Sequence, residues 1–417
     1  MAAAAIVLAV VVAMVVWRPW APYNHAESML SDQSALTQRP QQVWTRAADD
    51  LMPGTDDDYV RVVGTSQDES IVVVRLDSGF VGVARDTGEA IWAAETDSYC
   101  RVPGGGGADY RSAEESSRRS DVLVCADESS VVYRDIATGA VRERFSAQVA
   151  GEIVYFTVAN VDGAIIEVAT DEDGRLSIVS RNPKNLKENW KHNESVGDAS
   201  GAMDFLVAVV GSDVVISTGD RIHAYDKKNG RPSTRLPQSG YVAGLPNGTY
   251  LTVDHRGRMR ITGEGSLNAQ SVQGIVLLDS YDRLPELHLA CRDDDCSVVS
   301  ATTRTGKQLW TAPAMGSAGA FCGNHYIIPV SSSRGDNTRM VAHVAGSGES
   351  GWETPSVSYQ HGYSCRKDQF LIHNEESVVA YDARSGQRQW TIPGGYSVTH
   401  LDKGMLVNEG ESLVYYR

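Results

Sequence analysis

Beyond residue 20 the chain is built from short apolar runs separated by polar turns, without sustained 3.6-residue periodicity. Examples are SIVVVRL at 70–76, FVGVARD at 80–86 and VVAYD at 378–382. Runs of this length and alternation predict β-strands, because successive side chains of a strand face opposite sides of its sheet. We therefore expect an all-β chain with little helix.

One local pattern recurs along the chain: a strand ends at a turn that contains Gly, and Trp follows four positions later. The full pattern is present at Gly88 and Trp92, Gly306 and Trp310, Gly348 and Trp352, and Gly386 and Trp390. Weaker copies at 137–145 and 227–233 keep the turn without the Trp, whereas 181–190 keeps the Trp and replaces the Gly-bearing turn. Gly suits such a turn because it adopts positive φ without a Cβ clash.

Successive copies lie about 35 to 50 residues apart, which is the spacing of a four-stranded propeller blade. We predict that each Trp packs against the neighbouring blade and that the domain is a single β-propeller. The count of units is eight or nine, with the doubt at residues 240–272, and the sequence favours eight. The lone strand at Val43–Trp44 is expected to complete the last blade, so that N- and C-terminal strands close the ring and Trp44 marks the closure.

The N-terminal segment is predicted to associate with a membrane. Residues 2–17 are apolar and are followed by Arg18 and Pro19. A helix of this length spans roughly 24 Å, slightly less than a hydrocarbon core of ~30 Å. No basic residue precedes the run and no clear cleavage site follows it, so an uncleaved anchor is favoured over a signal peptide. The predicted organisation is an anchor or signal segment at 1–20, a flexible tether at 21–40 and the propeller at 41–417.

Six cysteines support an extracytoplasmic location, because disulfides persist outside the cytoplasm. The predicted pairs are Cys322 with Cys365, which occupy equivalent places in successive blades, Cys100 with Cys125 across a Gly-rich insertion at 103–120, and Cys291 with Cys296. Six unpaired buried thiols are the alternative. No pair of C-x-x-C motifs suggests a zinc site.

Charge and motifs exclude several function classes. The net charge of −15 disfavours nucleic-acid binding. The Asp-rich runs at 56–58, 171–174 and 292–295 do not have the spacing of an EF-hand and are interpreted as hairpin turns. No G-x-S-x-G or H-E-x-x-H motif is present, and His223 and His373, which lie in predicted strands, are interpreted as structural residues. The insertion at 103–120 is either a partner-binding loop or a mobile connection without a binding role.

The A-x-D-x-x-(T/S)-G-x-x-x-W pattern resembles the repeat of the pyrroloquinoline-quinone-like β-propeller superfamily. This superfamily includes quinoprotein alcohol dehydrogenases and the outer-membrane assembly lipoprotein of the BamB type. The resemblance covers about residues 41–417. The early Val-Trp strand and a C-terminus without its own last strand look like the BamB type.

The resemblance implies a non-enzymatic scaffold, because BamB-type proteins are partners in assembling outer-membrane barrels. The dehydrogenases carry a disulfide between adjacent cysteines, a quinone and Ca²⁺, and this chain has no Cys-Cys dipeptide. We expect no cofactor, no catalytic residue and no metal. The expected protein is a single-pass membrane scaffold with an extracytoplasmic propeller that binds an envelope or membrane protein. A ligand-sensing propeller and, less favoured, a quinone- and Ca²⁺-dependent dehydrogenase are the alternatives. No lipobox Cys is present near the N-terminus, so a helix would replace the lipid.

Overall fold

The computed structural model describes residues 38–417 apart from a set of short segments. The segments outside the description are 55–59, 97, 106–118, 148, 150, 162, 196–204, 211–212, 219–220, 234–240, 245–248, 254–258, 264–274, 282–283, 292–297, 304–307, 314–319, 332–337, 356–361, 367 and 375. The predicted membrane segment at 1–20 and most of the tether at 21–40 therefore lie outside the described residues. No helix within the described part is long and apolar enough to cross a membrane.

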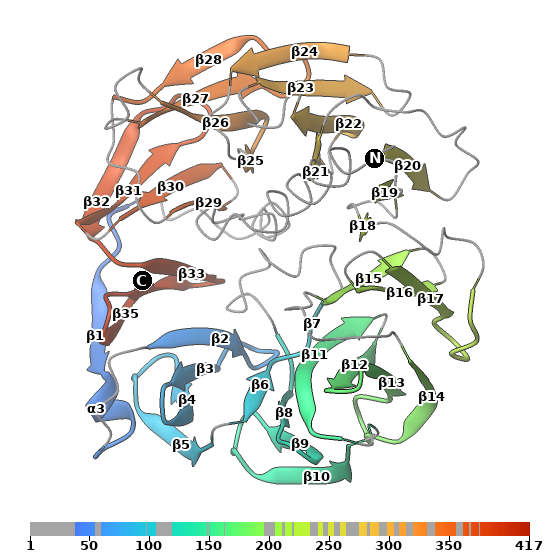
Figure 1. The fold of residues 1–417 in the computed structure, drawn as a ribbon. Helices are drawn as coiled ribbons and strands as arrows, with labels where there is room; N and C mark the ends of the chain where they lie inside the picture. Colours follow the sequence, from blue (N-terminus) through green and yellow to red (C-terminus); the bar gives the residue numbers. More distant parts are fainter. Residues whose placement is uncertain are drawn as a thin grey trace. The chain divides into compact units, whose positions relative to one another are not determined.

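The chain is all β, as predicted, and divides into two compact units. Among the described residues, unit 1 comprises 38–39 and Ala243–Gly394, and unit 2 comprises Pro40–Val242 and Gly395–Arg417. The one helix among the described residues is α3 (Ala48–Leu51), a single turn that follows the first strand. The strands of each unit pair as antiparallel neighbours within small sheets (Figure 1).

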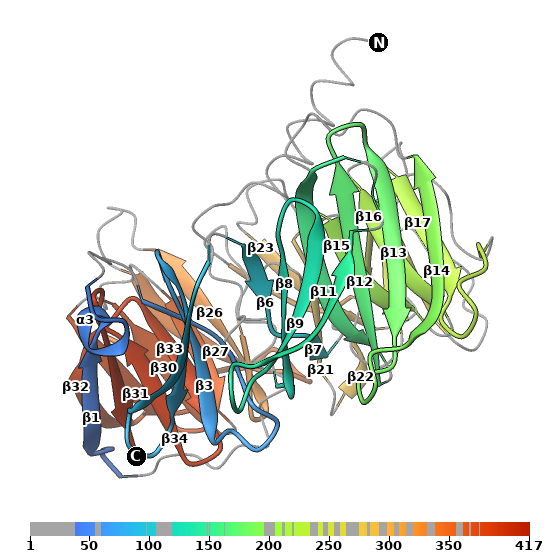
Figure 2. The same ribbon diagram turned by 90° about the horizontal axis from the view of Figure 1, so that it is seen from below.

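Five sheets belong to unit 2, and Figure 2 shows several of their strands side by side. Their strands are β2 (Arg61–Thr65), β3 (Ile71–Leu76), β4 (Gly79–Ala84) and β5 (Ala90–Glu95); β6 (Tyr99–Arg101), β8 (Val122–Ala126), β9 (Ser130–Asp135) and β10 (Val141–Ser146); β7 (Gly104–Gly105), β11 (Ile153–Val161), β12 (Ala164–Asp171), β13 (Arg175–Arg181) and β14 (Glu188–Ser195); β15 (Phe205–Val210), β16 (Asp213–Thr218) and β17 (Arg221–Asp226); and β33 (Ser397–Leu401), β34 (Gly404–Asn408) and β35 (Ser412–Tyr416) with β1 (Gln42–Ala47).

The remaining sheets lie in unit 1, whose boundary with unit 2 falls within β18. Their strands are β18 (Tyr241–Gly244), β19 (Thr249–Val253) and β20 (Met259–Gly263); β21 (Ile275–Tyr281), β22 (Leu284–Cys291), β23 (Val298–Thr303) and β24 (Gln308–Pro313); β25 (Ala320–Cys322), β26 (His325–Ser331), β27 (Thr338–Val344) and β28 (Ser350–Glu353); and β29 (Gly362–Arg366), β30 (Gln369–His373), β31 (Ser377–Asp382) and β32 (Arg388–Pro393).

The described strands form nine sheets, so the favoured count of eight blades is not confirmed. The difference arises where the sequence count was open. Strands β18, β19 and β20 form a sheet of their own, which carries no Gly-Trp repeat to mark it in the sequence.

The N- and C-terminal strands share one sheet. β1 pairs antiparallel with β35, with Trp44 opposite Tyr415 and Ala47 opposite Ser412. The order of this sheet is β1-β35-β34-β33. The predicted pairing of the Val43–Trp44 strand with the end of the chain is therefore present in unit 2.

Apolar layers lie between consecutive sheets. One cluster joins Trp44 and Leu413 to Val72 and Val74, and so packs the β1-containing sheet against the β2–β5 sheet. Similar clusters join the β2–β5 sheet to the β6–β10 sheet, and the β25–β28 sheet to the β29–β32 sheet. Because each of these sheets packs on its neighbours, near-continuous Val and Ile runs replace the alternation of a half-exposed strand.

Candidate functional site

Five Trp side chains contact a turn in the next sheet along the chain. They do not contact the turn that precedes them in their own sheet. The Trp44 indole N–H donates to the Arg85 carbonyl at 2.7 Å, and Trp92 donates to the Ile136 carbonyl at 2.7 Å. Trp190, Trp310 and Trp352 donate in the same way to Lys227, Ala345 and Ala383, at 3.0, 2.9 and 2.8 Å. We name this series the Trp–turn contacts.

The acceptor in each Trp–turn contact lies three residues before the turn glycine. These glycines are Gly88, Gly139, Gly230, Gly348 and Gly386, with φ between 66° and 71°. A Cβ on Gly88 would lie 2.6 Å from Trp44 Cδ2, and one on Gly139 would lie 2.6 Å from Trp92 Cγ. The turn therefore requires Gly twice over, for its positive φ and for the indole that lies on it.

Six of the eight repeat residues named by the sequence occupy these contacts, and Trp92, Trp310 and Trp352 are the indole donors among them. Gly88 contacts Trp44, Gly348 contacts Trp310 and Gly386 contacts Trp352. Trp390 is buried in β32, and Gly306 lies outside the described residues. The described repeat residues thus join neighbouring sheets through indole N–H groups and backbone carbonyls.

One junction departs from the series, between the β6–β10 sheet and the β11–β14 sheet. Glu143 stands four residues after Gly139, where Trp is expected, and Leu186 stands four residues before Trp190, where Gly is expected. Leu186 adopts φ 56° and its N–H donates to the Asn182 carbonyl at 2.8 Å, as the turn glycines do at their own positions. Leu186 belongs to the buried cluster that contains Tyr133 and partly buried Phe145.

A buried polar cluster accompanies this departure. Arg181 Nε lies 2.5 Å from Glu167 Oε1, Tyr133 donates its hydroxyl to the same oxygen, and the Arg181 guanidinium lies 3.7 Å from the centre of the Phe145 ring. Burial raises the pKa of Glu167 and the pKa of Tyr133. The cluster was not found from the sequence, although the four-residue step between Leu186 and Trp190 marks the turn.

Two of the three predicted disulfides lie within the described residues. Cys100 and Cys125 are directly opposite on β6 and β8 with S–S 2.03 Å. Cys322 and Cys365 join β25 and β29, the first strands of successive sheets in unit 1. Cys291 ends β22, but the pairing with Cys296 lies outside the described residues.

The insertion predicted at 103–120 is held at both ends, although 106–118 lie outside the described residues. At its start, β7 pairs in parallel with Ala159 and Asn160 of β11. At its end, the Ser120 N–H donates to the Thr65 carbonyl at 3.0 Å. The Cys100–Cys125 disulfide lies at its base.

Glu69 fixes the end of the insertion. Its carboxylate is 2% exposed, accepts the Asp402 N–H at 2.7 Å and pairs with Arg119. Arg119 also lies 3.1 Å from the Asp402 carboxylate, and Arg85 lies 4.0 Å from Glu69. Burial raises the pKa of Glu69, an effect partly offset by the Asp402 N–H and the two arginines. These contacts connect the β2–β3 and β33–β34 turns of unit 2.

A scan of protein-family models matches residues 78–325 to the family of outer membrane protein assembly factor BamB. The matched residues are more than half of the 417-residue chain. The chain belongs to this BamB family, whose members are β-propellers of the PQQ-like type.

Two solved structures resemble this BamB-family chain. BamB from Moraxella catarrhalis has a TM-score of 0.48 and 15% identity, over 91% of this chain and all of that chain. The quinohemoprotein alcohol dehydrogenase ADHIIG from Pseudomonas putida HK5 has a TM-score of 0.47 and 10% identity, over 96% of this chain and 78% of that one. Among curated proteins, none matches this chain significantly.

One of the three Asp-rich runs of the BamB-family chain, at 171–174, lies within the described residues. Asp171, from the Asp-rich run at 171–174, ends β12 and accepts the backbone N–H groups of Gly151 and Arg175. In the described residues no group of three or more His, Cys, Asp or Glu side chains is arranged to hold a metal ion. The other two Asp-rich runs lie outside the described residues.

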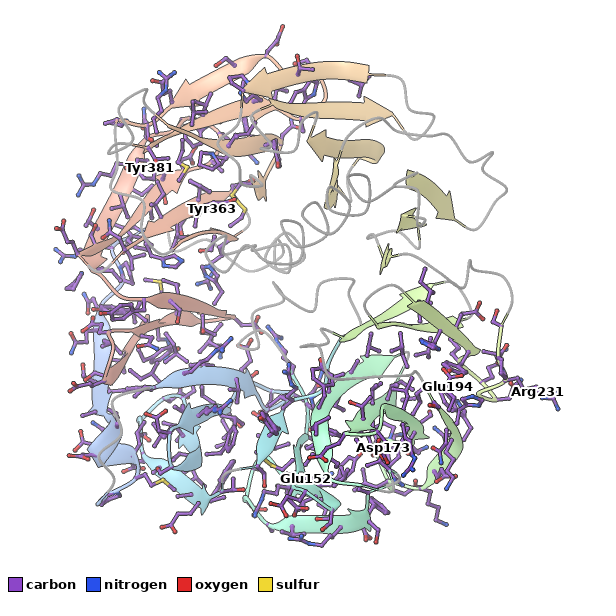
Figure 3. The ribbon with its side chains drawn as sticks, in the orientation of Figure 1. Glu152, Asp173, Glu194, Arg231, Tyr363 and Tyr381 are labelled. Atoms are coloured by element: carbon purple, nitrogen blue, oxygen red, sulfur yellow. A yellow bond between two sulfur atoms is a disulfide. The ribbon has the colours of Figure 1, made fainter. Side chains whose placement is uncertain are left out.

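His223, interpreted from the sequence as structural, pairs with Glu194 across two sheets. Glu194 in β14, which is labelled in Figure 3, accepts the Tyr225 hydroxyl at 2.5 Å and also pairs with His223 of β17. Burial alone would raise the pKa of Glu194, but hydrogen bonds from His223 and Tyr225 lower this pKa to about 2. The carboxylate is thus held as an anion that joins β14 to β17.

Proposed function

We propose that this protein is a non-enzymatic scaffold of the cell envelope, anchored at the membrane and binding another envelope protein through its extracytoplasmic domain. The observation that carries the proposal is the Trp–turn contact series in a BamB-family chain. The repeat residues of this chain hold sheets together, through indole N–H groups and backbone carbonyls. What varies around such a frame is its turns and loops, where partners commonly bind.

The organisation proposed for the chain follows the same argument. Residues 1–20 form a single-pass anchor, 21–40 a tether, and 41–417 one propeller in which β1 closes the ring. The pairing of β1 with β35 and the Trp44 contact with Arg85 support closure, because together they join the two ends of the chain to the β2–β5 sheet. With nine sheets described, the propeller is proposed to have nine blades, the second of the two counts open in the sequence.

The proposal is tested by purifying the tagged full-length protein from its own host in mild detergent after chemical crosslinking, followed by mass spectrometry. We expect reproducible crosslinks from one set of turns to a defined envelope protein, and recovery in the membrane fraction. A protein recovered without crosslinked partners would contradict the scaffold role. The ligand-sensing and dehydrogenase alternatives would then be tested with a quinone and Ca²⁺ as the first added ligands.

A further inference from the structure

A pocket lies at the end of the β6–β10 sheet that is opposite to the insertion. Tyr99 and Ala126 are paired at this end of β6 and β8, whereas Arg101 and Val124 lie toward the insertion. The pocket has a volume of about 400 Å³ and is lined by Tyr99, Ala126, Asp127, Glu128, Glu152 and Ile153, among others. This volume is within the range of ligand pockets, ~300–1,000 Å³.

Two consecutive sheets of unit 2 build the pocket. Ile153 begins β11, and its N–H donates to the Glu128 carbonyl at 3.2 Å, so the β8–β9 turn is fastened to the next sheet. Ala126 and Ile153 are 1% and 6% exposed and give the pocket an apolar floor. Figure 3 labels Glu152 close to the β6–β10 sheet. The site therefore rests on strands and not on the insertion.

The charge of the pocket is not balanced from within. Asp127 is satisfied, because it accepts hydrogen bonds from Ser129, Ser130 and Arg144. Burial opposes its ionisation, but these hydrogen bonds lower the pKa of Asp127. Glu128 and Glu152 are exposed and, within the described part of the chain, have no ion-pair partner. Two uncompensated carboxylates thus line one cavity.

An exposed aromatic ring lines the same pocket as these carboxylates. The side chain of Tyr99 is 55% exposed. An aromatic face beside carboxylates suits a guanidinium or ammonium group, which stacks on the ring while its hydrocarbon stem covers apolar surface. A bare metal ion would make no use of the Tyr99 ring.

We propose that this pocket binds an arginine- or lysine-bearing extended segment of a partner protein, with the cation facing Glu128 and Glu152 and its stem against Tyr99. Tyr and Arg are among the residues enriched in protein interfaces, which favours a protein segment as the occupant. That the occupant is a segment of a protein rests on the proposed scaffold function. The existence of the pocket and its negative charge do not depend on that function.

The test uses full-length protein in mild detergent and two capped, fluorescein-labelled pentapeptides, one centred on Arg and one on Gln. Fluorescence anisotropy is measured at low and at physiological salt. We expect the Arg peptide to bind more tightly than the Gln peptide, with affinity falling as salt rises. The Glu128→Gln/Glu152→Gln variant should bind the Arg peptide about tenfold more weakly.

The matched control is Glu172→Gln/Glu376→Gln, which changes the net charge equally at two exposed turn residues elsewhere and should retain wild-type affinity. Tyr99→Ala should weaken binding of the Arg peptide without altering the salt dependence. Equal affinity for the two peptides, or equal loss in the control variant, would overturn the proposal. Binding of free argininamide as tight as that of the peptide would also overturn it, in favour of a small-molecule cation site.

Failure here is distinguishable from failure of the scaffold role. If a crosslinked envelope partner is found but the pocket variant keeps its peptide affinity, only the pocket assignment is wrong. If the peptide binds through Glu128 and Glu152 but no envelope partner exists, the scaffold role is wrong and the pocket assignment stands.

Discussion

At the scale of single residues, the fold depends on a glycine that meets an indole from another sheet. Gly139 has φ 70°, and a Cβ there would lie 2.6 Å from Trp92 Cγ. Gly163 has φ 77°, but a Cβ there would have no atom within 4 Å to obstruct it. A substitution at either glycine strains the backbone, but only a substitution at Gly139 also produces a steric clash.

Gly139→Ala is therefore predicted to lower the free energy of unfolding more than Gly163→Ala. Both variants carry the left-handed strain of roughly 1–2 kcal/mol. Only Gly139→Ala adds the displacement of Trp92, roughly 1–3 kcal/mol. Urea-unfolding midpoints monitored by circular dichroism measure the difference. Equal midpoints would show that the Trp–turn contact tolerates a methyl group.

The acid response of the protein should include Glu194. Its pKa is lowered from 4.5 to about 2, so its contribution to stability is present above pH 4.5 and is lost as the pH falls toward about 2. Glu194→Gln removes this titration but can still accept the Tyr225 hydroxyl. The stability advantage of the wild type over the variant should shrink across this pH window.

The control is Glu172→Gln, at an exposed position in the β12–β13 turn. Its unfolding temperature should parallel that of the wild type at every pH. A constant difference between the wild type and Glu194→Gln from pH 6 to pH 2 would refute the assignment of this titration to Glu194.

At the scale of elements, neighbouring sheets are joined by aromatic contacts and, among the described residues, in one place by a disulfide, Cys322–Cys365. The sequence predicted the Trp copies, the tight turns and two disulfides that are present, because each depends on a local pattern. It did not predict the Tyr133–Glu167–Arg181 cluster, since those residues lie on three strands and share no spacing. The β18–β20 sheet lies in residues 240–272, where the sequence left the count open between eight and nine because no Gly-to-Trp step marks this sheet.

The inter-sheet disulfide should contribute more stability than the disulfide within a sheet. Cys322 and Cys365 are 43 residues apart, and Cys100 and Cys125 are 25 apart. The loop-entropy relation gives losses of about 4 and about 3.5 kcal/mol for the paired Cys→Ala variants. Urea-unfolding midpoints of the two double variants, measured without reductant, test the order. A larger loss for the Cys100–Cys125 variant would contradict it.

Strand β1 is predicted to stabilise the C-terminal strands β33–β35 against local unfolding. Trp44 is 6% exposed, its indole binds the Arg85 carbonyl, and its ring lies 5.8 Å from that of Tyr415. Trp44→Ala should cost about 3–5 kcal/mol and raise hydrogen exchange in β33–β35. Ile91→Ala, at an exposed position of β5, serves as the control. Unchanged exchange in β33–β35 would show that β1 does not hold this sheet.

At the scale of the whole molecule, the sequence predicted the family and the repeated β-sheet architecture. It did not predict which side chains gather on the surface of the sheets. The Gly-to-Trp step is encoded locally and repeats often enough to be recognised. The pocket beside Tyr99 draws Glu128 from a turn and Glu152 from the start of another sheet. Only the folded arrangement brings those side chains to one cavity.

The central claim, that this BamB-family chain is a protein-binding scaffold, is tested most directly by native mass spectrometry of the tagged full-length protein purified from its own host in mild detergent. We predict a species whose mass is that of the chain plus one defined envelope protein, in fixed stoichiometry. A spectrum containing the single chain alone, or the chain with only a small molecule bound, would contradict the claim.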